Sequence, residues 1–106
     1  MEIKEYEKQA LQFAIYDQKV IYPALGLNGE AGEVAEKVKK ILRDKNGDIT
    51  ETDALEIAKE LGDVLWYICA MARDINLSLQ DIAELNIQKL TSRAERNKLN
   101  GSGDNR

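Results

Sequence analysis

The chain has no histidine among its 106 residues, and cysteine, proline, phenylalanine and tryptophan occur once each. Without histidine there is no Ser-His-Asp triad, no histidine general base and none of the usual histidine zinc sites. A single cysteine excludes a disulfide within the chain and favours a reducing compartment. The scarcity of proline and of large aromatic residues argues against a β-rich fold with many turns. The available chemistry is therefore that of carboxylates, amines, guanidines and bound metal.

Long hydrophobic runs and an excess of positive charge are missing as well. No stretch of about 18 apolar residues occurs, and residues 1–5 lack the apolar core of a secretory signal. We therefore expect a cytoplasmic protein with no membrane partner. A formal net charge of -4 is unfavourable for nucleic-acid binding through a broad basic surface. This charge still permits a small anionic ligand at a local site.

Apolar residues recur at steps of three and four over most of the chain, which is the spacing of amphipathic helices. The predicted helices cover residues 3–21, 27–41, 54–75 and 79–94. The first is expected to end before Pro23, and the polar stretch 44–48 to form a turn. Thr50 and Ser78 each precede an aspartate by three residues, a pattern typical of capping boxes at the starts of the third and fourth helices.

This pattern predicts an all-α fold, an antiparallel helical bundle of about four helices with short connections. The third helix carries the widest apolar surface, which includes Trp66 and Cys69, and is expected to be central; Cys69 is interpreted as a core residue. A core of this size is marginal alone, so we expect a homodimer or homotetramer formed through helix packing. The helical domain is predicted to cover residues 1–99, and residues 100–106 to form a polar, flexible C-terminal tail.

Two acidic residues of the second helix fall where apolar residues are expected. On a helical wheel Glu30 lies about 40° from Val34, inside the apolar stripe, and Glu33 lies about 100° away, on its border. A carboxylate that faces a core needs a cation or a proton, because burial in an unpaired, ionised state costs several kcal/mol. One explanation is a structural ion pair with Lys37 or Lys40.

Glu60 and Asp63 repeat the same spacing on the third helix, at the flank of its apolar stripe. Two such helices packed side by side would bring four carboxylates into one cluster, which repels itself unless cations bind. Oxygen ligands of this kind suit Mg²⁺, with Mn²⁺ as a substitute, and the lack of histidine and paired cysteine disfavours zinc and copper. The four charges would balance two Mg²⁺ ions.

Residues 27–36 (LNGEAGEVAE) and 60–67 (ELGDVLWY) therefore carry an E-x-x-E and an E-x-x-D motif, each followed by apolar helix. In this combination they resemble the paired motifs of the MazG-like all-α nucleoside triphosphate pyrophosphohydrolases. The resemblance covers about residues 27–71, with a weaker similarity in the Asn86-x-x-Lys89-x-x-x-Arg93 stretch. It implies an enzyme that hydrolyses an NTP or dNTP to the monophosphate and pyrophosphate.

The resemblance also implies roles for the acidic residues. Mg²⁺ would be held by Glu30, Glu33, Glu60 and Asp63. A water activated by the metal would attack the α-phosphorus in line with the departing pyrophosphate, with one of these carboxylates as the catalytic base. The spacing does not identify the base, and we prefer Glu33 because it lies at the border of the stripe.

Basic and aromatic side chains are candidates for substrate binding. The candidates are Lys37, Trp66, Tyr67, Asn86, Lys89 and Arg93, with Phe13 and Tyr16 as further aromatic contributors. The polar residues on the fourth helix form one stripe, which is either ordinary surface or a set of triphosphate contacts. Trp66 and Tyr67 directly follow the second acidic motif and could stack on a nucleobase, although Trp66 also suits a core or a subunit interface.

Two other functions stay open from the sequence. A non-catalytic helical oligomer or adaptor would use the same acids in ion pairs with lysines across an interface. A phosphohydrolase on a related bundle would act on another polyphosphate, such as a diphosphate or a phosphoribosyl-ATP. Stabilisation by Mg²⁺ distinguishes the first alternative, and product analysis distinguishes the second.

Overall fold

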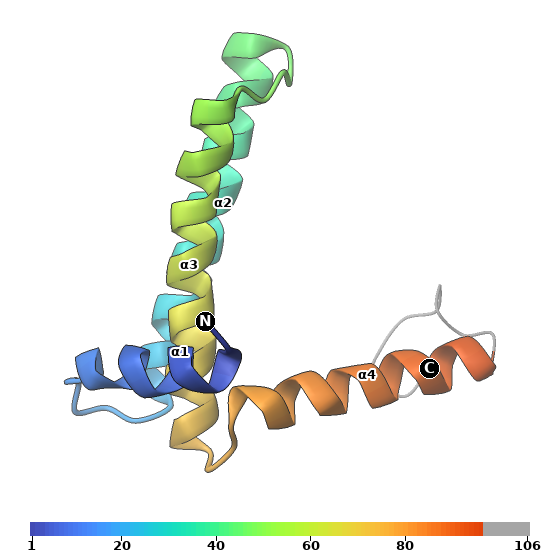
Figure 1. The fold of residues 1–106 in the computed structure, drawn as a ribbon. Coiled ribbons are helices and arrows are strands. Elements are labelled where there is room, and N and C mark those ends of the chain that lie inside the picture. Colours follow the sequence, from blue (N-terminus) through green and yellow to red (C-terminus); the bar gives the residue numbers. More distant parts are fainter. Residues whose placement is uncertain (97–106) are drawn as a thin grey trace.

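The computed structural model describes residues 1–96, and its regular elements are all helices (Figure 1). These elements are α1 (Ile3–Ala10), the short 3-10 helix η1 (Leu11–Phe13), α2 (Ile21–Lys45), α3 (Glu51–Asp74) and α4 (Leu79–Glu95). The predicted all-α fold with four α-helices is confirmed. The tail predicted at residues 100–106 lies outside the described residues.

Within residues 1–96, no helix is both long enough and apolar enough to span a bilayer.

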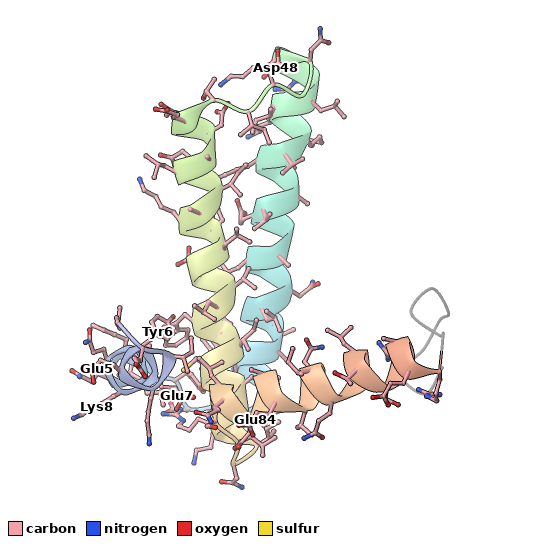
Figure 2. All side chains as sticks on the ribbon, turned by 45° about the vertical axis from the view of Figure 1, so that its right-hand side comes forward. Glu5, Tyr6, Glu7, Lys8, Asp48 and Glu84 are labelled. Atoms are coloured by element: carbon pink, nitrogen blue, oxygen red, sulfur yellow. The ribbon has the colours of Figure 1, made fainter. Side chains whose placement is uncertain are left out.

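The two long helices, α2 and α3, lie side by side and antiparallel (Figures 1 and 2). The chain reverses after α2 because Asn46 and Gly47 adopt φ values of 55° and 83°, the left-handed conformation that commonly ends a helix. Thr50 then accepts a hydrogen bond from the Asp53 backbone N–H, and the Asp53 carboxylate accepts one from the Thr50 N–H. The predicted capping box is confirmed, and so is a turn between the two helices, but it begins later than predicted because Asp44 and Lys45 still belong to α2.

The other two helices meet the hairpin at the end opposite its turn. α1 crosses α3 there, and α4 starts there and runs away from the α2–α3 pair (Figure 1). A capping box of Ser78 and Asp81 begins α4, as predicted, and the Glu7 carboxylate of α1 accepts a hydrogen bond from the Leu79 backbone N–H. Within one chain, α2 and α3 are therefore the helices that show the antiparallel packing expected of the bundle.

The core is small and lies where α1, α3 and α4 meet. Ala10, Cys69 and Leu79 are buried there, and Cys69 is only 1% exposed, as expected of a core residue. Burial raises the pKa of this thiol to about 11. Elsewhere large apolar side chains stay accessible, including Leu55 on α3 and Ile87 on α4. The Cα radius of gyration is 16.5 Å, against about 13 Å for a compact domain of this length, so one chain leaves much apolar surface uncovered.

The helix predicted over residues 3–21 is wrong in its second half. α1 ends at Ala10, η1 adds one tight turn, and residues 14–20 are not helical. Side chains from α3 explain the break, because Trp66 Nε1 donates a hydrogen bond to the Ala10 carbonyl and Asp74 binds two groups of the 14–20 connection. α2 begins earlier than predicted and holds Pro23 in its first turn, where no backbone N–H is needed.

Candidate functional site

Three of the four predicted acidic residues meet between α2 and α3. Glu30 points from α2 toward α3, where Glu60 and Asp63 lie one turn apart, and one carboxylate oxygen from each lies within 4.8 Å of the others. Glu30 and Glu60 are half-buried, and Asp63 is exposed. The i, i+3 spacing on α3 and the position of Glu30 within its apolar stripe therefore produce a shared cluster.

The fourth predicted acid, Glu33, is exposed and lies outside the set of oxygens that approach within this distance. It is still close enough to act on the cluster electrostatically. Burial raises the pKa of Glu30, and the neighbouring charges of Asp63, Glu60 and Glu33 raise it further. The cluster is therefore a site where negative charge is concentrated and repels itself.

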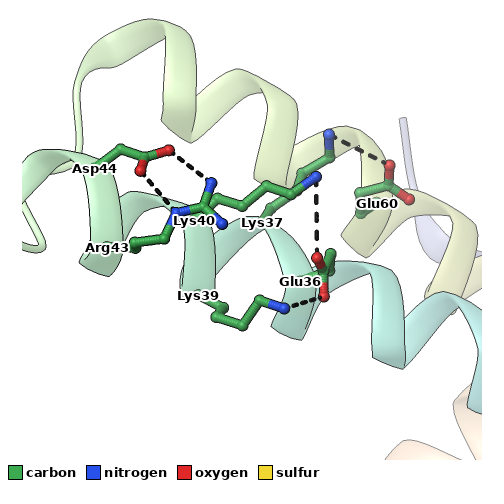
Figure 3. A network of polar contacts seen from close by, with 7 residues as sticks. All are labelled: Glu36, Lys37, Lys39, Lys40, Arg43, Asp44 and Glu60. Carbon is green, nitrogen blue, oxygen red and sulfur yellow. Dashed lines mark hydrogen bonds and ion pairs between the residues drawn. The ribbon is translucent and has the colours of Figure 1, made fainter.

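Ion pairing accounts for only part of this charge. Lys37 Nζ lies 3.8 Å from a Glu60 oxygen (Figure 3). It also lies 4.0 Å from a Glu56 oxygen. The other cation considered from the sequence, Lys40, pairs with Glu36 at 3.9 Å. Among residues 1–96, no ion pair reaches Glu30 or Asp63.

The donor set of the cluster suits a hard divalent cation. Three carboxylates from two packed helices offer only oxygen ligands, which Mg²⁺ and Mn²⁺ prefer. A cation among them would relieve the repulsion that raises the pKa of Glu30. The residues present therefore fit a divalent metal.

An aromatic pocket of about 310 Å³ lies close to the acidic cluster. It is lined by Phe13, Ile15, Tyr16, Tyr22, Trp66 and Tyr67. Tyr67 adjoins both sites: burial raises the pKa of its phenol, the Tyr22 hydroxyl raises it further, and so do the charges of Glu30 and Asp63. The pocket and the acids are therefore two parts of one surface.

Trp66 contributes to the pocket and to the core at once. Its indole N–H is held by the Ala10 carbonyl at 2.9 Å, and its ring packs against the core residues. The Tyr67 ring meets it edge-on, with the centroids 5.1 Å apart. This position agrees with the interpretation of Trp66 as a core residue, and its predicted stacking on a nucleobase stays a prediction.

Sequence reasoning missed Tyr22 and Gly26. The Tyr67 ring lies against Gly26 so closely that a Cβ at that position would overlap it. Tyr22, Gly26 and Glu30 are spaced four residues apart, so they share one face of α2. Extending the Glu30 face toward the start of α2 would have identified both residues.

The substrate-binding candidates on α4 lie elsewhere in the single chain. Asn86 and Lys89 are exposed on the part of α4 that runs away from the α2–α3 pair, and Arg93 is buried further along the same helix (Figure 1). One chain does not bring them to the acidic cluster. Their predicted role in substrate binding stays a prediction.

Comparison with known proteins agrees with this geometry. The MazG nucleotide pyrophosphohydrolase domain matches residues 21–97, which include the acidic cluster and all of α2, α3 and α4. The chain is also 42% identical over 114 aligned positions to the "Gene 37 protein" of Mycobacterium phage L5, with 100% of both chains covered. No solved structure matches. The chain therefore belongs to the MazG nucleotide pyrophosphohydrolase family.

Proposed function

We propose that this protein is a Mg²⁺-dependent hydrolase that converts an NTP or dNTP and water to the monophosphate and pyrophosphate. The observation that carries the proposal is the cluster of three carboxylates beside an aromatic pocket, two of them without an ion pair among residues 1–96. The metal that accompanies a polyphosphate binds where negative charge is concentrated, and a nucleobase can stack on an aromatic surface. Tyr67 adjoins both features.

Glu30, Glu60 and Asp63 would hold the metal, with Glu33 at the edge of the set. A divalent ion bound there would neutralise phosphate oxygens and lower the pKa of a nucleophilic water. Glu33 is our candidate for the base that accepts the proton of that water, because its carboxylate is exposed and adjacent to the cluster. Attack at the α-phosphorus would then release pyrophosphate from the opposite side.

The aromatic pocket is the proposed site for the base. Tyr67, which adjoins both the pocket and the acids, would orient the sugar and base relative to the reacting phosphate. Stacking on Trp66 and Tyr67 would be tolerant of base identity, because every base has an aromatic face. Lys37, next to Glu60, would contribute positive charge toward the pyrophosphate.

We further propose a homodimer or homotetramer in which α4 of one copy contributes phosphate contacts to another copy. α4 runs away from its own hairpin, and it carries exposed Leu85 and Ile87 together with Lys89. Exposed apolar residues on α2 and α3 give this helix a surface on which to pack. Mixing Lys89→Ala with Asp63→Asn chains should restore part of the activity if sites form between copies. Mixtures as inactive as the separate variants would argue against shared sites.

One observation favours the non-catalytic alternative, a helical oligomer or adaptor. Lys37 already approaches Glu60, as expected if the acids serve as structural ion pairs. The Lys37–Glu60 ion pair does not explain why Glu30 and Asp63 lie beside Glu60, whereas a metal-dependent hydrolase explains all three acids. A cytoplasmic location, which we also propose, is in keeping with the free, buried Cys69.

The test is a panel of ordinary and modified NTPs and dNTPs incubated with the full chain and Mg²⁺. Pyrophosphate and a monophosphate as the only products would support the proposal. Orthophosphate with a diphosphate, or hydrolysis only of a diphosphate or a phosphoribosyl-ATP, would favour the related phosphohydrolase. No product from any substrate, with either Mg²⁺ or Mn²⁺, would overturn the enzyme proposal.

A further inference from the structure

The connection between η1 and α2, residues 14–20, forms one wall of the aromatic pocket. Its Tyr16 ring stacks on Tyr22 with centroids 5.0 Å apart and meets Trp66 edge-on at 6.5 Å. Ile15 lines the same pocket and is 90% exposed. The shape of the pocket therefore depends on how this irregular segment is held.

Asp74, the last residue of α3, fixes the 14–20 connection through hydrogen bonds. Its carboxylate is fully buried, and Oδ2 accepts hydrogen bonds from the Tyr16 hydroxyl at 2.8 Å and the Val20 backbone N–H at 2.9 Å. Arg73 pairs with Oδ1 at 3.2 Å and donates to the Tyr16 hydroxyl at 3.3 Å. Burial acts to raise the pKa of Asp74, but these hydrogen bonds keep it below its usual value.

The backbone of the connection needs such support. Val20 has φ 67° and ψ -53°, and the Ile21 N–H bonds the Lys19 carbonyl across it at 2.7 Å, which is a γ-turn. A β-branched residue in this conformation is strained, and it persists only where the surroundings fix it. Tyr22 and Ala24 of α2 donate backbone hydrogen bonds to the Gln18 and Val20 carbonyls, and the Asp74 carboxylate is the side chain of α3 that binds the Val20 N–H.

We propose that Asp74 is a positioning residue that fixes the 14–20 connection and so forms the aromatic pocket before the base of the nucleotide enters it. The proposal rests on the proposed function for the identity of the ligand. Asp74 lies behind Tyr16 and acts on the ligand only through it. A preformed pocket lowers the ordering cost of binding, so loss of Asp74 should weaken nucleotide binding more than it slows the chemical step.

The structure offers a matched control on the same helix. Asp53, in the first turn of α3, also accepts a backbone N–H bond, from Thr50, and also pairs with a cation, Lys45. Asp53→Ala therefore removes the same kinds of interaction far from the pocket. Trp66 is the single tryptophan, so its fluorescence reports on the pocket and on the core next to it, and Asp53→Ala controls for a general loosening of the core.

The experiment compares Asp74→Ala, Tyr16→Phe and Asp53→Ala in the full chain. Without nucleotide, acrylamide should quench Trp66 more strongly in Asp74→Ala than in the wild type. With nucleotide, the KM of Asp74→Ala should rise about tenfold, while its kcat should change less than about twofold. Tyr16→Phe keeps the stacking but loses one hydrogen bond to Asp74, and should fall between the wild type and Asp74→Ala in both measurements. Asp53→Ala should lower the unfolding temperature and leave quenching and KM unchanged.

The proposal would be overturned by wild-type quenching in Asp74→Ala, or by equal changes in Asp53→Ala, which would indicate a general loss of stability. Unchanged KM in Asp74→Ala would also contradict it. If the wild-type protein hydrolyses no nucleotide, the proposed function fails, and the quenching comparison still decides whether Asp74 fixes the pocket.

Discussion

Two regions of the α2–α3 hairpin, the end beside the turn and the middle, treat charge in opposite ways. Near the turn, Lys45 bonds Asp53 at 2.9 Å and Arg43 bonds Asp44 at 2.7 Å, so acids and bases neutralise each other (Figure 3 shows Arg43 and Asp44). Near the middle, Glu30 faces Glu60 and Asp63, and burial and these charges raise its pKa. Charges that serve the fold are paired, whereas unpaired, mutually repelling charges mark a candidate site.

The largest expected effect comes from removing a charge from the acidic cluster. Asp63→Asn or Glu60→Gln should lower pyrophosphate release at least roughly 100-fold, because disturbing only the groups that support a metal ligand typically costs 10–100-fold. The helical circular-dichroism signal should persist, since these substitutions keep the side-chain shape. Activity is measured at saturating Mg²⁺.

Glu56→Gln is the control for this prediction. Glu56 lies one turn before Glu60 and also pairs with Lys37, but it is exposed and outside the cluster. Its substitution should leave turnover within about twofold of the wild type, as for most surface changes. Near wild-type turnover in Asp63→Asn would contradict the metal assignment.

Added Mg²⁺ should stabilise the protein by relieving repulsion in the acidic cluster, without acting on the paired charges near the turn. A ligand at 100 times its Kd stabilises the folded state by about 2.7 kcal/mol, which raises the unfolding temperature by on the order of 10 °C in a domain of this size. Asp63→Asn should abolish this shift, and Glu56→Gln should keep it. The measurement is thermal unfolding in Mg²⁺ against sodium chloride of equal ionic strength. A wild-type protein indifferent to Mg²⁺ would favour the non-catalytic oligomer.

Two glycines of α2 extend the comparison from charge to packing. Gly26→Ala should destabilise the protein by about 1–3 kcal/mol and weaken nucleotide binding, because the new Cβ overlaps the Tyr67 ring. Gly32→Ala, whose Cβ would meet open space, should instead stabilise it by up to about 1 kcal/mol through helix propensity. Urea unfolding of both variants tests the pair. Equal effects of the two substitutions would show that Tyr67 does not pack on Gly26.

Much of the fold and of the acidic cluster follows from local sequence signals. The turn at Asn46 and Gly47 and the capping box at Thr50 set the ends of α2 and α3, and the antiparallel pairing then brings Glu30 beside the acids of α3. Helical periodicity and these signals at the helix ends are enough to predict that Glu30 lies near the acids of α3. The same spacing could not show that Glu33 stays outside the three-carboxylate set, because that depends on the rotation of α2 against α3.

The pocket and its supports depend on contacts that the sequence does not display. Trp66 bonds Ala10 across 56 positions of the chain, and Asp74 bonds Val20 across 54. These contacts override the helical periodicity of residues 14–20. The direction of α4 likewise depends on the residues where it meets α1, among them Glu7, and not on its own amphipathic pattern.

The smallest expected effect compares single charges in these two regions of the hairpin in metal-free buffer. Glu30→Gln should raise the unfolding temperature by a few degrees at neutral pH, because it removes a carboxylate whose pKa the folded state raises through burial and neighbouring acids. Asp53→Asn should lower it, because the Lys45 amine and the Thr50 N–H hold the pKa of Asp53 below its usual value.

Both differences in unfolding temperature should vanish in acid: the increase in Glu30→Gln and the decrease in Asp53→Asn. Folded Glu30 binds its proton more tightly than the unfolded chain, so its ionisation destabilises the fold as the pH rises through its raised folded-state pKa. Folded Asp53 binds its proton more weakly, so its contribution is present above the unfolded pKa and is lost as the pH falls through its lowered folded-state pKa. Thermal unfolding of the wild type and both variants from pH 7 downward measures these slopes. If Glu30→Gln destabilised the metal-free protein at pH 7, the two regions of the hairpin would not differ as described, because Glu30 would be making a favourable structural contact rather than a repulsive one.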